Sequence, residues 1–183
     1  DAYFACDQVF LDEVSARFKP GLTISSNPLV IAVARGNPLA ISGLADLARP
    51  GLRVGLAHPE KSALGKLTLD QLVKAEVMEK IRAANTLKQD APQGDFLVNA
   101  LRTGALDAAV VYASNLAFSR DELDFVPVPD ADAVQPYAIA INTPNALAMQ
   151  RLLETITAPE GQARFEDLGF AWRYGKEPEE SGR

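Results

Sequence analysis

The sequence of 183 residues has one cysteine, Cys6, and one histidine, His58. A single cysteine cannot form an intramolecular disulfide, and a lone histidine with no cysteine nearby does not make a zinc-binding pattern. Long hydrophobic runs are missing as well, since stretches such as 29–34 and 108–113 fall far short of the roughly 20 residues that cross a bilayer. We therefore expect neither a structural metal site nor a transmembrane helix.

Basic side chains are too few for an extended basic face. The chain has 18 Lys and Arg against 24 Asp and Glu, which gives a formal net charge of −6. This balance argues against nucleic acid or an anionic membrane as a partner. Hydrophobic residues make up 48% of the chain, which is enough for a sizeable core and excludes disorder of the main body.

Both ends of the sequence differ from the middle. Residues 1–5 have the composition of a short buried strand, and no methionine or apolar signal region precedes them, so we expect a missing upstream segment. Apolar sheet surface near Tyr3, Phe4 and 137–141 would then need a cover, either from that segment or from self-association of the truncated chain. The polar residues 174–183 are expected to form a flexible tail.

Strand-like and helix-like patterns alternate along the chain. Expected strands cover 1–5, 29–34, 53–57, 86–88, 107–112, 123–128 and 137–141, the last two separated by a stretch rich in Pro and Asp. Expected helices run from Asp7 to about Phe18, from Ser62 or Ala63 onward, and over 43–48, 76–84, 95–103, 145–156 and 159–168. This order predicts an α/β fold with a mostly parallel sheet, in which ligands bind at the turns beyond the carboxyl ends of the strands.

The turn 55–65 contains the first candidate binding groups. It joins a strand to a helix that starts near Ser62, and it exposes the N–H groups of Ala63, Leu64 and Gly65. Such N–H groups, together with the helix dipole, bind anions without basic side chains. Ser62 equally serves as an ordinary helix cap, and no phosphate-loop motif is present, so the turn alone leaves both interpretations open.

Two further positions have a similar character. Gly94 lies in the turn 89–95 before another helix and allows a ligand to approach the backbone closely. Tyr112 ends the apolar strand 107–112, where its phenol is able to donate a hydrogen bond to a ligand but equally to be a core aromatic residue bonded to the backbone. On local grounds neither position decides between the two interpretations.

The order of these elements resembles a known family. The matching segments are 2–8, 27–33, 46–55, 58–65 (HPEKSALG), 109–114 (AVVYAS) and 159–170. They are similar to segments of the molybdate-binding receptors of ABC importers, within the type II periplasmic solute-binding proteins. The resemblance covers roughly residues 1–173. It departs from the family at His58, where the family usually has Asp, at Ala63, where it usually has Pro, and at Cys6.

The resemblance implies a two-lobed receptor that closes on a tetrahedral oxyanion, molybdate or tungstate. Residues 34–116 would form the second lobe, while 1–33 and 117–173 would form the rest of the first lobe, whose ligand serines lie upstream of residue 1. The ligand-binding residues carried over by the resemblance are Ser62, Ala63, Leu64, Gly94 and Tyr112. It implies no cofactor and no metal cation, a periplasmic or other extracytoplasmic location, and the permease of the importer as partner. Without the upstream donors, this chain alone is expected to bind molybdate poorly.

Two other functions remain open from the residues. Ser62 near His58 suggests a nucleophile and base, but the sequence has no G-x-S-x-G elbow and no evident carboxylate partner, so we do not expect an enzyme. The same fold also serves as the effector-binding domain of cytoplasmic regulators, although no helix-turn-helix pattern is visible here. Molybdate, tungstate and sulfate cannot be told apart, because all three are tetrahedral dianions and differ in size.

Overall fold

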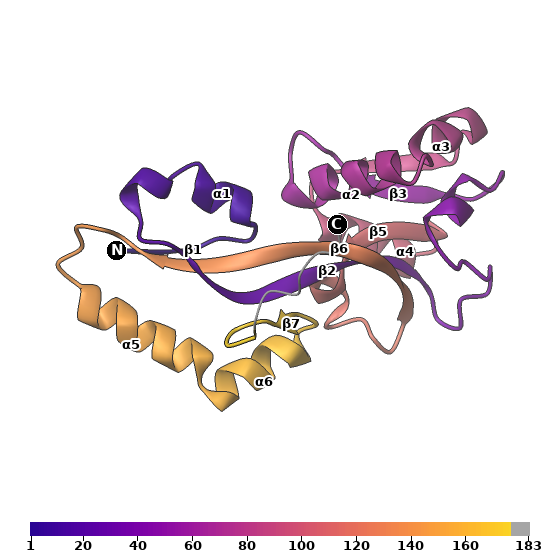
Figure 1. Cartoon of the computed structure of the whole chain (residues 1–183). Helices are drawn as coiled ribbons and strands as arrows, with labels where there is room; N and C mark the ends of the chain where they lie inside the picture. Colours follow the sequence, from indigo (N-terminus) through magenta and orange to yellow (C-terminus); the bar gives the residue numbers. More distant parts are fainter. Residues whose placement is uncertain (177–183) are drawn as a thin grey trace. The chain divides into compact units, whose positions relative to one another are not determined.

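The computed structural model describes residues 1–176 (Figure 1). By its contacts the chain divides into two compact units. The terminal unit consists of Asp1–Ser26 and Val134–Arg183, and the central unit consists of Asn27–Ala133. Two long strands, β2 (Leu22–Ala34) and β6 (Leu123–Ile139), have residues in both units.

The terminal unit combines antiparallel strands with short helices. Its elements, besides parts of β2 and β6, are β1 (Ala2–Phe4), α1 (Gln8–Asp12), the 3₁₀ helix η1 (Ser15–Arg17), α5 (Ala146–Thr157), α6 (Pro159–Asp167) and β7 (Ala171–Trp172). Strand β1 pairs antiparallel with the end of β6, and β7 pairs antiparallel with the start of β2. Two small apolar clusters hold this unit, one around Leu11 and one around Tyr137 and Trp172.

The central unit is an α/β layer structure. Its remaining elements are the 3₁₀ helix η2 (Leu44–Ala48), β3 (Val54–Ala57), α2 (Ala63–Lys74), α3 (Met78–Ala84), β4 (Leu87–Ala91), α4 (Gly94–Arg102), β5 (Ala108–Tyr112) and the 3₁₀ helix η3 (Ala113–Leu116). The strand order here is β6-β2-β5-β3-β4. Strand β3 pairs parallel with both β4 and β5, whereas β2 and β5 are antiparallel.

Helices cover both faces of the strands in the central unit. A side chain at Gly55 would meet Leu97 of α4 and Leu106, so that face of β3 lies against α4. The next residue, Leu56, lines a cavity with residues of α2 and α3, and successive strand residues point to opposite faces. Because both faces are covered, residues 108–111 of β5 are fully buried, as the continuous apolar run predicts.

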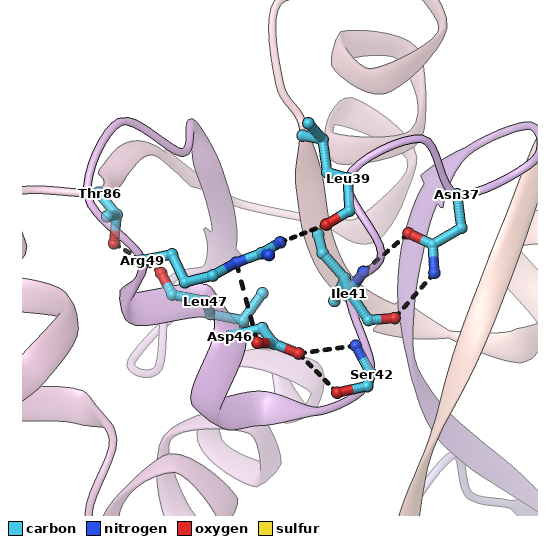
Figure 2. Close-up of polar contacts among 8 residues, drawn as sticks. All are labelled: Asn37, Leu39, Ile41, Ser42, Asp46, Leu47, Arg49 and Thr86. Carbon is cyan, nitrogen blue, oxygen red and sulfur yellow. Dashed lines mark hydrogen bonds and ion pairs between the residues drawn. The ribbon is translucent and has the colours of Figure 1, made fainter.

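A polar network fixes the long connection between β2 and β3 (Figure 2). The side-chain amide of Asn37 both accepts the N–H of Ile41 (3.0 Å) and donates to its carbonyl (2.8 Å). Asp46 accepts the backbone N–H and the hydroxyl of Ser42, both at 2.7 Å. These hydrogen bonds lower the pKa of the Asp46 carboxyl. Arg49 Nη2 donates to the carbonyl of Leu39 at 2.6 Å, which closes the loop.

Four sequence expectations need correction. The strand expected over 29–34 begins earlier, at Leu22, as β2. The expected strands 123–128 and 137–141 are parts of one strand, β6, which tolerates Pro127 and Pro129 because both prolines are exposed. The first helix ends at Asp12 rather than near Phe18, since Phe18 forms an isolated antiparallel bridge with Ala140. The sheet is mixed rather than mostly parallel, and its parallel pairs are those of β3 with β4 and β5.

The predicted lobes and the compact units have different bounds. The units divide at 26/27 and 133/134, whereas the lobe prediction places its bounds at 33/34 and 116/117. Contact density does not define a ligand-binding lobe, so the lobe bounds stay a prediction. Of the expected tail 174–183, residues 177–183 lie outside the described residues.

Candidate functional site

The first candidate group is the start of α2, where Ser62 is the N-cap. Its Oγ accepts the N–H of Gly65 at 3.0 Å, and its carbonyl accepts the N–H of Lys66 at 3.1 Å. Within the part of the chain that the structure describes, no acceptor binds the N–H groups of Ala63 and Leu64. These two N–H groups therefore remain available at the positive end of the α2 dipole.

Close packing holds this helix start against the end of β3. A Cβ on Gly65 would collide with the carbonyl group of His58 and approach the oxygen of Ala57 to 2.7 Å. The His58 carbonyl also accepts the N–H groups of Lys61 (3.1 Å) and Ser62 (3.2 Å). The turn is therefore built from backbone contacts around one carbonyl, and only glycine fits at position 65.

The side chain of His58 supports the same turn. Its Nδ1 accepts the N–H of Glu60 at 3.1 Å, and its Nε2 lies 3.8 Å from Oδ2 of Asp90 on β4. Ser62 Oγ donates to the His58 carbonyl at 3.4 Å. Its two hydrogen bonds, this one and the one from the N–H of Gly65, therefore both involve the main chain. This geometry does not make a nucleophile and base of Ser62 and His58.

The second candidate group is the start of α4, where Gly94 is the first helical residue and is buried. The N-cap, Gln93, makes no capping bond through its side chain. The side-chain amide of Asn115 lies directly over Gly94, because a Cβ at that position would come within 2.5 Å of Asn115 Oδ1. Asn115 Nδ2 also donates to Asp95 Oδ1 at 2.9 Å, so one asparagine covers the first turn of α4.

Tyr112, the third candidate, ends β5, and its hydroxyl is buried. Its backbone N–H donates to Asn115 Oδ1 at 3.1 Å. Asn115 thus connects Tyr112 to Gly94, two positions that the sequence prediction named separately. The neighbouring Ser114 is held in turn by Asn27 of β2, whose Nδ2 donates to Ser114 Oγ at 2.9 Å. Sequence reasoning missed both asparagines.

Topology brings the three candidate groups to one edge. Strands β5, β3 and β4 are neighbours and run parallel, and each candidate follows or ends the carboxyl end of one of them. The start of α2 follows β3, Gly94 follows β4, and Tyr112 ends β5. This is the edge at which α/β sheets bind ligands. That these residues bind a ligand stays a prediction.

Comparison with known proteins identifies the family. A family model described as "Bacterial extracellular solute-binding protein" matches residues 11–171. The chain belongs to this family. Its members are binding proteins and not enzymes, which confirms the expectation that the chain is not an enzyme.

Curated proteins with similar sequences have names that are more specific than the family description. Proteins named "Molybdate-binding protein ModA" in Mycobacterium tuberculosis and Mycobacterium bovis are 30% identical to this chain over 180 residues. The match covers 93% of this chain and 65% of each relative, so the chain spans slightly less than two thirds of their length. The resemblance drawn from the sequence is confirmed at this level.

Solved structures show the fold. The substrate-binding domain of a putative molybdenum ABC transporter from Clostridium difficile has a TM-score of 0.74 at 20% identity, covering 94% of this chain and 77% of that one. The periplasmic molybdate-binding protein of Azotobacter vinelandii has a TM-score of 0.70 at 18% identity, covering 94% and 78%. The sulfate-binding protein SubI of Mycobacterium tuberculosis has a TM-score of 0.70 at 19% identity, covering 93% and 68%. The α/β periplasmic-binding-protein fold is thereby confirmed.

The described residues show neither a metal-binding cluster nor a helix suited to cross a membrane. Across residues 1–176, no cluster of three or more His, Cys, Asp or Glu side chains is arranged to hold a metal ion. No helix in the same part of the chain combines the length and the apolar character that crossing a membrane requires.

Proposed function

We propose that this chain is the ligand-binding part of an extracytoplasmic receptor that captures a tetrahedral oxyanion, molybdate or tungstate, for an ABC importer. The observation that carries the proposal is the 30% identity to proteins named molybdate-binding over 93% of the chain. The family description, which specifies extracellular proteins, favours this over a cytoplasmic regulator.

The chemistry of the candidate edge supports an anion rather than a cation. The donors are the N–H groups of Ala63 and Leu64, the backbone at Gly94, and the hydroxyls of Ser62 and Tyr112. Fixed N–H dipoles at helix starts stabilise negative charge without a basic side chain. A protein of net charge −6 is therefore able to hold a dianion in a site built from neutral donors.

Size and shape set the choice among tetrahedral anions in this proposal. Neutral donors at fixed positions bind best the anion whose oxygen atoms reach all of them at once. Molybdate and tungstate are nearly the same size and are larger than sulfate. We therefore propose that the site binds the first two with similar affinity and sulfate more weakly.

Calorimetric titration of the full-length natural protein tests the proposed function. The expected result is saturable binding of molybdate and tungstate with one site per chain, and binding of sulfate that is at least tenfold weaker. Absence of heat from all three anions, or a preference for sulfate, would overturn the proposal. The membrane permease is tested separately, because ligand capture does not require it.

A further inference from the structure

The central unit contains a cavity that the oxyanion proposal does not use. It has a volume of about 350 Å³ and lies among β3, β4, α2 and α3. Its lining includes none of the five candidate ligand residues described above. The apolar part of the lining is mostly leucine, including Leu56, Leu69 and Leu72, with one methionine, one alanine and one proline. The size and the lining are those of a pocket for a small molecule.

Thr68 of α2 is the buried polar residue in this lining. The residue is 1% exposed, and its hydroxyl has no hydrogen-bond partner within residues 1–176. A helical threonine usually bonds the carbonyl four residues earlier, which here belongs to Leu64, and valine has the same shape without the hydroxyl. A buried hydroxyl without a partner calls for an explanation, and a molecule in the cavity provides one.

The charged groups around the cavity favour a hydrogen-bond donor with positive charge. Glu60 and Asp90 contribute two carboxylates to the lining. The cation of the lining, Arg82, is bound to Glu79 outside it, with Nη1 to Oε1 at 2.5 Å. The lining therefore has two carboxylates against one guanidinium, and the charge of that guanidinium is balanced by Glu79, so the potential of the lining favours a cation.

His58 adds one hydrogen-bond donor to this lining and, as a neutral ring, does not change the net charge of the lining. Its Nδ1 accepts the N–H of Glu60, so the N–H of the neutral ring is on Nε2, which lies 3.8 Å from the Asp90 carboxylate. The Asp90 side chain is about half exposed, at 49%, and remains accessible to a ligand.

We propose that this cavity is a second binding site of the chain and that it takes a small primary amine with a compact apolar body. The apolar body fills the space between Leu56, Leu69 and Leu72. The ammonium group donates to acceptors of the lining, which are the Thr68 hydroxyl and the carboxylates of Glu60 and Asp90. The site is separate from the anion donors, and molybdate does not compete for it.

The test uses 2-phenylethylamine as probe, with 2-phenylethanol and 3-phenylpropionate as neutral and anionic analogues. Amide shifts in ¹⁵N-labelled protein report the place of binding, and their dependence on concentration gives the affinity. The expected result is saturable shifts at residues of the lining with the amine, at least tenfold weaker binding of the alcohol, and no binding of the acid. Equal binding of amine and alcohol, or shifts elsewhere on the chain, would overturn the proposal.

Variants separate the contributions of the lining. Thr68→Val keeps the shape and removes the hydroxyl, so the protein should be at least as stable while the amine binds about tenfold more weakly. The double variant Glu60→Gln with Asp90→Asn should also bind the amine about tenfold more weakly. Asp70→Asn, at an exposed position of α2, is the control and should bind the amine as the parent does. Leu69→Trp fills the cavity and should abolish binding. Unchanged amine affinity in Thr68→Val and in the double variant would rule out the assigned contacts, and unchanged affinity in Leu69→Trp would rule out the cavity itself.

Discussion

At the scale of single residues, the proposed anion site depends on hydrogen-bond donors at the starts and ends of a few elements. The N–H groups of Ala63 and Leu64 point out of the first turn of α2, while Ser62 satisfies the N–H of Gly65. Tyr112 adds a buried hydroxyl at the end of β5. The residue types were visible in the sequence, and the family resemblance assigned them to one ligand, but the strand order that makes their three turns neighbours comes from the structure.

In the proposed site, Tyr112→Phe removes one hydrogen-bond donor to the bound anion. Such a hydrogen bond contributes roughly 1.5–3 kcal/mol, so we expect about a tenfold to hundredfold loss of molybdate affinity. Calorimetry on the full-length protein measures this loss. Tyr174→Phe, at a tyrosine that is 36% exposed, serves as the matched control and should bind as the parent does. Equal affinity of Tyr112→Phe and the parent would remove Tyr112 from the site.

Asp107→Asn tests an ion pair through its pH dependence. Hydrogen bonds from the Arg53 side chain lower the pKa of Asp107 in the folded protein. Because the folded-state pKa is the lower one, the pair stabilises the fold above the unfolded-state pKa of about 3.9, and this contribution is lost as the pH falls through the folded-state value. Urea unfolding should show the variant less stable than the parent at pH 7, with the difference shrinking below about pH 4. A difference that does not depend on pH would contradict this cause.

At the scale of elements, two helix starts are positioned by close contacts of glycine. Gly65 brings α2 against the His58 carbonyl, and Gly94 brings α4 beneath the Asn115 side chain. Several elements were predictable from the sequence, since α4 and β5 begin and end, and α2 begins, within about two residues of the expected bounds. The role of Asn115 was not predictable, because its partners at 94, 95 and 112 lie on two other elements that only the fold brings together. The continuous β6 was missed because Pro127, Pro129 and Pro136 indicate breaks, and only the structure shows that Pro127 and Pro129 are exposed and that the strand continues through all three.

Gly65→Ala should destabilise the protein. The new Cβ meets a backbone carbonyl, which cannot move without shifting the turn 58–62, and overpacking of this kind costs about 1–3 kcal/mol. Gly43→Ala is the control, because nothing lies within 4 Å of its added Cβ and its backbone is extended. Thermal and urea unfolding give both values. Equal stability of the two variants would show that the approach of α2 to β3 is looser than described.

Gly94→Ala should also destabilise the protein, but for a different reason, and a second substitution should restore the stability. The added Cβ collides with a side chain, Asn115, instead of with backbone. In the Asn115→Ala background this space is empty, so Gly94→Ala should be destabilising in the parent and close to neutral there. Unfolding free energies of the two single variants and the double variant form the cycle. Additive effects would mean that Asn115 does not lie over Gly94 in solution.

At the scale of the whole molecule, composition and fold place different limits on function. The net charge of −6 argues against an extended basic face, and the family places the chain among solute-binding proteins. The relatives at 30% identity are named for molybdate, while solved structures of the same fold include proteins named for sulfate and for ferric ion. The fold therefore does not select the ligand, and in the proposed function the donors at the edge of β5, β3 and β4 do so.

The most direct test of that claim is a titration of the ¹⁵N-labelled 183-residue chain with sodium molybdate, followed by amide chemical shifts. The method reports the place of binding as well as its strength, and it detects weak binding. The account predicts saturable shifts at Ala63, Leu64 and Gly94, with smaller shifts for sulfate at the same concentration and ionic strength. Saturable shifts confined to other residues, or none at these three amides at millimolar molybdate, would contradict the placement of the site.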